Sequence, residues 1–232
     1  MTTLLLASAS PARFSTLTAA GVTPSVTVSA VDEDAVLAAA RERFGPLDPA
    51  DAVLLLAQAK AEDVTRTIES ATDDVDAQPD VVLGCDSMLE LDGEIYGKPG
   101  TAEVAVQRWR AMRGRSGILH TGHWVVDLRD ADAGGTGGTL GATSATTVHF
   151  ADLSDTEIDA YVATGEPLAV AGGFTVDGLG GAFVTGIEGD YHSVVGVSLP
   201  LLRELLGQIG IEWTDLWDGD RTTRPAAGAP LM

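Results

Sequence analysis

Apolar and polar residues alternate along this chain in two periods, one typical of strands and one typical of helices. Short apolar or alternating runs predict strands over residues 4–6, 22–30, 81–89, 94–96, 118–128, 143–151 and 182–187. Apolar stripes at helical spacing, with capping residues near their starts, predict helices over 13–20, 35–44, 48–68, 101–112, 154–165 and 200–206. Strands that alternate with helices, together with two antiparallel hairpins, predict an α/β fold with a mixed sheet.

The first predicted strand leads into a helix through the turn Ser8-Ala9-Ser10-Pro11-Ala12-Arg13. Small residues let the main chain approach a ligand closely, and the free N–H groups at a helix start attract an anion. Arg13 falls in the first helical turn, where its charge opposes the helix dipole and is better explained by a negative group nearby. The turn has the features of a phosphate cradle, and an ordinary capped helix after a buried strand is an equal alternative.

Composition and charge narrow the class of protein. The 232 residues are 45% hydrophobic, enough for a core, and no apolar run approaches the roughly 20 residues of a membrane span. The N-terminal segment lacks a signal-peptide pattern and Cys85 is the single cysteine, so we expect a cytoplasmic protein with no membrane partner. The net charge of −20 argues against a polymeric nucleic acid partner but allows a small phosphorylated ligand.

Lysine is rare among the basic residues. The chain has 14 lysines and arginines together, and only Lys60 and Lys98 are lysines. A compact ammonium does not replace a planar guanidinium, so lysines retained against this bias are candidate ligand contacts. Lys60 borders the apolar stripe of a predicted helix, where it either extends to solvent or reaches a site. Lys98 lies on the tight turn Gly97-Lys98-Pro99-Gly100.

Two carboxylates are further candidates. Asp86 ends the apolar run 81–85, and a buried aspartate is costly unless it is paired, bonded to the backbone or bound to a metal. Glu33 lies in the acidic trio 32–34 before a predicted helix. This position either stabilises the helix start or turns Glu33 inward to hold a divalent cation.

Several other segments carry weaker signals. His120 and His123 lie three apart on one predicted strand and so on opposite faces, which argues against a metal pair. Residues 72–80 and 130–141 predict flexible loops, the second as an insertion at a hairpin tip. The glycine-rich segment 171–181 implies a main chain that closely approaches a ligand or another strand. The C-terminal tail, residues 208–232, is expected to be weakly ordered.

Taken in order, these residues resemble the Maf family of nucleoside triphosphate pyrophosphatases over roughly residues 3–206. The resemblance rests on the Ser-Ala-Ser-Pro-x-Arg turn at 8–13, Glu33, Lys60, Asp86, Gly97-Lys98-Pro99, and the segments with Gly-Gly and Ile-Glu-Gly-Asp at 172–190. Each mark is weak alone, and their shared order makes the resemblance specific.

The resemblance implies an elongated α/β fold similar to that of inosine triphosphate pyrophosphatases. It implies a single catalytic domain over residues 1–207, with two lobes around a cleft, and often a homodimer. It also implies hydrolysis of a nucleoside triphosphate to the monophosphate and pyrophosphate, with Mg²⁺ or Mn²⁺ as cofactor.

The family roles transfer by position. Asp86 would be the proton acceptor and would bind the metal together with Glu33. The triphosphate turn would be formed by Ser8, Ser10 and Arg13, with Lys60 and Lys98 as further catalytic and phosphate contacts.

Departures from the family pattern concern mainly the base. Members that act on dTTP and UTP usually carry Arg, Thr and Gln where this chain has Ala12, Ser87 and Asp177. Because Ser87 keeps a hydroxyl, we expect a pyrimidine or a relaxed base preference. Gly186 and Ser193 replace a usual Arg and Asn, which leaves a non-catalytic nucleotide-binding regulator of cell division as the alternative.

Overall fold

The computed structural model describes residues 2–71 and 78–217. In these residues a seven-stranded mixed sheet has the order β2-β1-β3-β5-β6-β7, and β4 pairs with β3 beside this path. The strands are β1 (Leu4–Leu6), β2 (Ser25–Val26), β3 (Val81–Leu91), β4 (Glu94–Tyr96), β5 (Ser116–Asp127), β6 (Thr139–Phe150) and β7 (Val184–Glu188). The β2-β1-β3 pairings are parallel and the others antiparallel, which confirms the predicted mixed α/β fold.

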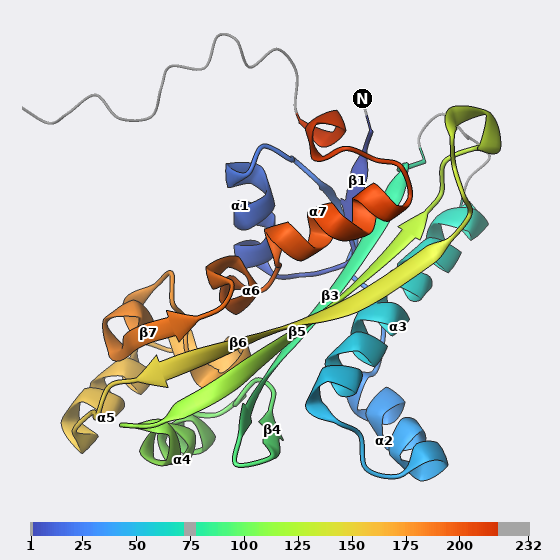
Figure 1. Ribbon diagram of the computed structural model, residues 1–232. Helices are drawn as coiled ribbons and strands as arrows, with labels where there is room; N and C mark the ends of the chain where they lie inside the picture. The colour runs from blue at the N-terminus through green and yellow to red at the C-terminus, as the bar shows by residue number, and fades with distance from the viewer. Residues whose placement is uncertain (1, 72–77, 218–232) are drawn as a thin grey trace, which may run out of the picture.

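Helices cover the sheet and connect its strands (Figure 1). The α-helices are α1 (Pro11–Ala19), α2 (Glu33–Phe44), α3 (Pro49–Ala71), α4 (Ala102–Met112), α5 (Asp155–Ala163), α6 (Tyr191–Val195) and α7 (Leu199–Gln208). Short 3₁₀ helices are η2 (Ala131–Ala133), η3 (Glu166–Ala169), η4 (Ala171–Gly173), η5 (Leu179–Phe183) and η6 (Trp213–Leu216). No helix in the described part of the chain combines the length and the apolar character needed to cross a bilayer.

Side-chain alternation along β3 divides the core. Leu83 and Cys85 pack in a cluster with α7, and Leu89 and Leu91 pack in a second cluster with α4 and α5. Residues of the other parity, such as Val82, pack under α3 on the opposite face. Because β3 runs through both clusters, it joins the two ends of an elongated molecule (Figure 1).

Two glycines let α3 lie directly on the sheet. A Cβ at Gly84 would lie 2.1 Å from the Ala57 carbonyl oxygen, and one at Gly122 would lie 2.4 Å from the Val53 oxygen. Atoms cannot approach this closely, so any larger residue at either position would force the helix away from the sheet. The contact fixes the distance between the α3 side chains and β3.

Three sequence-based expectations differ from the structure. The strand expected over 22–30 pairs only at β2, because its partner β1 is three residues long. The strand expected from residue 143 begins earlier, at Thr139, which shortens the loop expected over 130–141. At this hairpin tip the Asp127 carboxylate accepts hydrogen bonds from Arg129 and Thr136. Although burial raises the pKa of Asp127, these bonds lower it to about 2. The expected strand 182–187 begins only at Val184, after η5.

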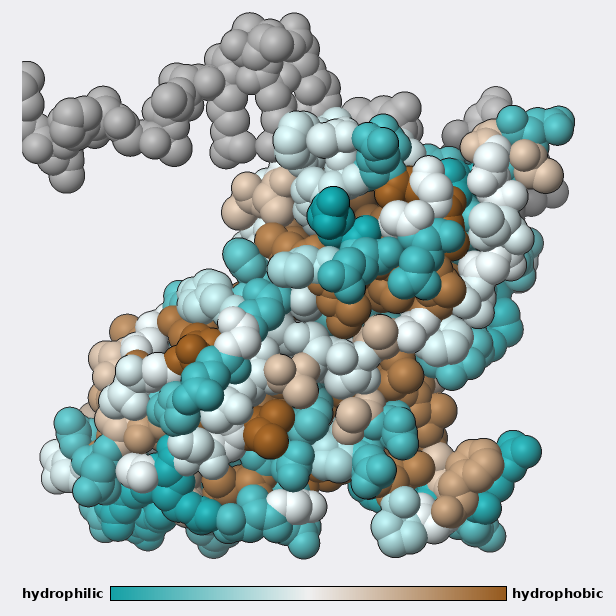
Figure 2. Space-filling view, in the orientation of Figure 1, coloured by the Kyte–Doolittle hydropathy of each residue, from teal (hydrophilic) through white to brown (hydrophobic). Residues whose placement is uncertain are grey.

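The C-terminal boundary also moves. Ile209, Ile211 and Leu216 are buried in the core cluster of α7, so the packed domain extends past residue 207 to η6. Residues 218–232 of the expected tail, and residues 72–77 of the expected mobile loop, lie outside the described residues. Figure 2 shows polar side chains over much of the visible face, with apolar residues gathered in separate patches.

Candidate functional site

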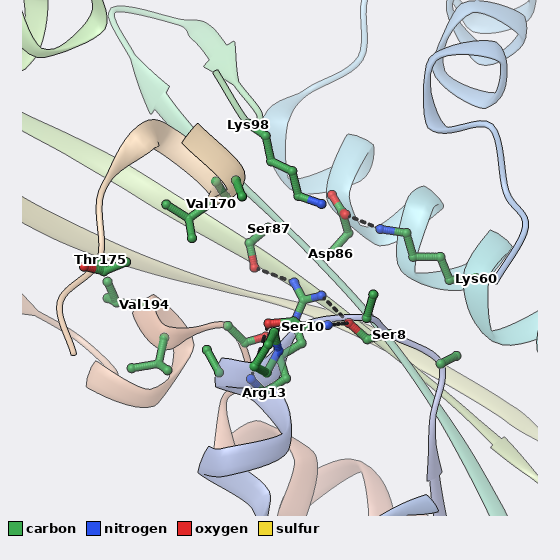
Figure 3. Close-up of a pocket in the computed structure, with 18 of the residues that line it drawn as sticks. Ser8, Ser10, Arg13, Lys60, Asp86, Ser87, Lys98, Val170, Thr175 and Val194 are labelled. Carbon is green, nitrogen blue, oxygen red and sulfur yellow. Dashed lines mark hydrogen bonds and ion pairs between the residues drawn. The ribbon is translucent and has the colours of Figure 1, made fainter. Parts of the chain in front are cut away.

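A pocket lies beside a gap in the strand pairing of β3. On one edge of β3, β1 pairs through Leu83 and β4 begins to pair at Leu89. Within the described residues no strand covers the segment 84–88 at this edge. A pocket of about 550 Å³ opens there, lined by the turn after β1, by α3, by the segment 169–177 and by the end of α6. Figure 3 shows the polar side chains that converge on it.

The turn after β1 holds Arg13 in a fixed orientation. The Ser10 side chain caps α1 by accepting the Arg13 main-chain N–H, and Pro11 occupies the first helical position. The guanidinium donates from Nη1 to Ser8 Oγ (3.0 Å), from Nη2 to Ser87 Oγ (3.1 Å) and from Nε to the Gly196 oxygen (2.7 Å). A guanidinium has five N–H donors, so two remain for a ligand in the pocket.

A buried ion pair lies at the centre of the pocket. Lys60 Nζ is 2.6 Å from Asp86 Oδ1 and 2.7 Å from Glu33 Oε1. Asp86 and Lys60 are only 6% and 8% exposed, and the second carboxylate oxygen of Asp86, Oδ2, is buried without a hydrogen-bond partner among the described residues. The pair therefore leaves one oxygen of Asp86 without a protein partner among the described residues.

Burial and charge act differently on the two carboxylates. Burial raises the pKa of Asp86 above its ordinary value, against the opposing attraction of Lys60 and Arg13. Burial also raises the pKa of Glu33, but the hydrogen bond and charge of Lys60 outweigh it, so the net pKa is lowered. Asp86 is thus the stronger base of the two.

Lys98 approaches the same centre from the β4 side. It is exposed, lines the pocket and has no ion-pair partner in the described residues (Figure 3). The main chain beside it is anchored, because the Gly97 carbonyl accepts the Gly172 N–H at 3.1 Å and the Gly100 N–H donates to the Leu168 oxygen. The glycine-rich segment, which was predicted to approach a ligand or another strand, holds the Lys98 turn just after β4 through Gly172.

The segment that carries Asp177 is organised by one carboxylate. Glu166 accepts hydrogen bonds from the Thr175 and Tyr161 hydroxyls and from the main-chain N–H groups of Leu179 and Gly180. These donors flank Val176 and Asp177, which line the pocket. Sequence reasoning did not single out Glu166.

All ten residues predicted for the site line this one pocket, namely Ser8, Ser10, Ala12, Arg13, Glu33, Lys60, Asp86, Ser87, Lys98 and Asp177. The histidines predicted not to form a metal pair bond elsewhere. His120 Nε2 contacts Glu90, and His123 Nε2 accepts the Ser198 N–H at 2.8 Å.

Sequence reasoning predicted Ser8 and Ser87, which bond Arg13, but missed two residues that complete this arrangement. Gly196 supplies its carbonyl, and Thr121 lies opposite Ser87 in the β3–β5 register, with its hydroxyl 2.9 Å from Ser87 Oγ. Neither residue belongs to a recognisable local motif. Only the pairing of strands far apart in the sequence could have indicated them.

The fold and the site define an α/β protein with a mixed sheet and a pocket in which three cations and three carboxylates converge. A family model described as Maf-like protein matches residues 3–209, and the chain belongs to this family. It is 50% identical over 215 residues to a protein of Leifsonia xyli named nucleoside triphosphate pyrophosphatase, covering 93% of this chain and 96% of that protein.

Two further relatives have the same name. One from Nocardia farcinica is 55% identical over 221 residues, covering 93% of this chain and 96% of its own length. One from Salinispora tropica is 51% identical over 226 residues, covering 97% of this chain and 92% of its own length.

Proposed function

We propose that this protein is a nucleoside triphosphate pyrophosphatase that hydrolyses its substrate to a nucleoside monophosphate and pyrophosphate. The observation that carries the proposal is the convergence of Arg13, Lys60 and Lys98 on one buried carboxylate, in a chain whose net charge is −20. The pocket also contains Glu33, Asp86 and Asp177, but three cations against three carboxylates is far less acidic than the 14 against 34 of the whole chain. This local enrichment of cations indicates a polyanionic ligand. The names of the relatives support the same activity.

The phosphate contacts follow from the free donors. Arg13 has two N–H groups left after its protein contacts, and Lys98 has no ion-pair partner in the described residues. Both face the pocket, so both would bind phosphate oxygens and stabilise the charge that grows on them during cleavage.

Asp86 would accept the proton of the attacking water. Its Oδ2 is unpaired, while Lys60 holds Oδ1 and so fixes the orientation of the carboxylate. The raised pKa of Asp86 makes it a stronger base than an ordinary aspartate. The water oxygen would form a bond to the α-phosphorus, the bond from that phosphorus to the bridging oxygen would break, and pyrophosphate would leave.

The residues present fit a divalent cation. Asp86 Oδ2 lacks a partner, and Glu33 and Asp86 meet at the same ammonium group. The described residues contain no cluster of three or more metal-binding side chains, and Mg²⁺ commonly uses one or two carboxylates together with substrate phosphates. A bound Mg²⁺ or Mn²⁺ would neutralise phosphate charge and draw electrons from phosphorus.

A pyrimidine or relaxed base preference is the finer part of the proposal. Ala12 offers no hydrogen-bonding side chain, and the Ser87 hydroxyl already contacts Arg13 and Thr121. Asp177 is exposed at the rim of the pocket and, when ionised, offers only acceptors. These features favour weak discrimination over strict selection of one base.

A nucleotide panel tests the proposal. Each common ribonucleoside and deoxyribonucleoside triphosphate is incubated with the protein and Mg²⁺ or Mn²⁺, and released pyrophosphate is measured. We expect turnover that stops when EDTA removes the metal. Saturable nucleotide binding without turnover under any metal would refute the enzyme and support the alternative, a nucleotide-binding regulator.

A further inference from the structure

The hydroxyl groups behind Arg13 form a chain with a defined direction. Thr121 Oγ1 lies 2.9 Å from the Ser193 carbonyl oxygen, which can only accept, so Thr121 donates its proton there. The Ser87 hydroxyl, 2.9 Å from Thr121 Oγ1, must therefore be the donor in that contact. This leaves the lone pairs of Ser87 Oγ to accept the Arg13 Nη2 proton at 3.1 Å.

Thr121 is well placed to fix this chain. It is fully buried on β5, between the two long strands that flank it in the sheet. His123, two residues further along β5, accepts the Ser198 N–H at Nε2. Its Nδ1 therefore carries the proton and donates to the Thr121 carbonyl. The Thr121 main chain is thus held by a buried hydrogen bond beside the strand pairing.

The Thr121 hydroxyl also supports a second group that accepts a hydrogen bond from Arg13. The Ser193 carbonyl lies near the end of α6, three residues before Gly196, whose carbonyl accepts the Arg13 Nε proton at 2.7 Å. Thr121 therefore supports two of the three groups that hold the guanidinium. It contacts Ser87 directly, and it acts on Gly196 through the end of α6.

We infer that Thr121 is a positioning residue, which orients the Arg13 guanidinium for a polyphosphate through Ser87 and the end of α6. The inference deepens the proposed function and rests on it for the identity of the anion. It also changes the role of Ser87, because its hydroxyl orients the phosphate-binding Arg13 rather than contacting the base.

The test is a calorimetric titration of the whole protein with inorganic tripolyphosphate in the presence of Mg²⁺, which measures the binding affinity. Thr121→Val keeps the shape of the side chain and removes the hydroxyl, and we expect about tenfold weaker binding. Thr121→Ser restores the hydroxyl and should restore affinity. Thr143→Val is the matched control, because Thr143 also donates to a main-chain oxygen at 2.9 Å, but that oxygen belongs to Ala50 and not to α6.

A double-mutant cycle separates positioning from general stability. In an Arg13→Met background, Thr121→Val should no longer change the affinity, because the group that it orients is gone. Ser87→Ala provides a second route, since it cuts the chain while the bond from Thr121 to Ser193 stays intact. It should weaken binding about fivefold even if Thr121→Val does not fold.

Unchanged affinity in both Thr121→Val and Ser87→Ala, or an equal loss with and without Arg13, would overturn the inference. The titration involves no turnover. A wild-type protein that binds tripolyphosphate and shows the Arg13-dependent loss, yet hydrolyses no nucleotide, would refute the proposed function and leave the positioning role supported.

Discussion

Asp86 and Lys60 are both more than nine-tenths buried, and each charge is tolerable only because the other is present. A buried pair of this kind adds little net stability, whereas removal of one partner leaves an uncompensated charge. The arrangement is therefore better explained by chemistry than by folding. The unpaired Asp86 Oδ2 supports this interpretation, because a purely structural aspartate would bond both oxygens.

A pH-dependent stability is expected from His123. Burial and the charge of Arg13 lower its pKa from 6.5 to about 4. Between these values the unfolded chain binds a proton that the folded chain does not, so the free energy of unfolding falls as pH falls. Urea unfolding at pH 7 and pH 5 should show about 2 kcal/mol more loss in wild type than in His123→Gln, which keeps an acceptor for Ser198 but does not titrate. Equal losses would contradict the assignment.

The residues of the site were predictable by type and order, but their partners were not. Lys60 stood out as one of two lysines, and Asp86 as an acid in an apolar run. That these two form one ion pair depends on how α3 packs on β3, which no local pattern contains. Thr121 has no local signal at all and enters only through strand register.

At the scale of elements, the contact of α3 with the sheet sets the geometry of the site. Gly84 lies two residues before Asp86 on β3, and Ala57 lies three residues before Lys60 on α3. The close approach of Gly84 to Ala57 therefore brings the two charged side chains within 2.6 Å of each other. A greater distance between α3 and the sheet would separate Lys60 from Asp86.

Gly84→Ala should consequently reduce both stability and activity. The added Cβ would meet the Ala57 carbonyl at 2.1 Å, and we expect a loss of about 2 kcal/mol together with a fall in kcat. Gly207→Ala in α7 is the control, because nothing lies within 4 Å of its Cβ and it should stabilise the protein by about 0.5 kcal/mol. Thermal unfolding and pyrophosphate release check both variants; an undiminished rate in Gly84→Ala would contradict the argument.

Elements with their own core or cap signals were predicted well, and those that depend on distant partners were not. The capping box at Ser154 and Glu157 correctly indicated the start of α5. The short pairing of β2 depends on the length of β1, and the order of the hairpin tip depends on Asp127. The burial of Leu216 depends on a core cluster built mainly from earlier segments.

Across the whole molecule, charge is distributed unevenly. The chain carries 34 acidic and 14 basic residues, whereas the pocket beside β3 balances Arg13, Lys60 and Lys98 against Glu33, Asp86 and Asp177. This contrast selects compact polyanions that enter the pocket over extended ones that must contact the acidic exterior. The expected homodimer and cytoplasmic location stay predictions.

The central claim is that Asp86 activates water for attack on a triphosphate held by the cations around it. The most direct measurement separates the products of one nucleotide by anion exchange, for wild type and Asp86→Asn, with binding measured in parallel. We expect monophosphate and pyrophosphate from wild type, and at least a hundredfold lower rate from Asp86→Asn with nucleotide binding retained. Diphosphate and phosphate as products, or an undiminished rate in Asp86→Asn, would contradict the account.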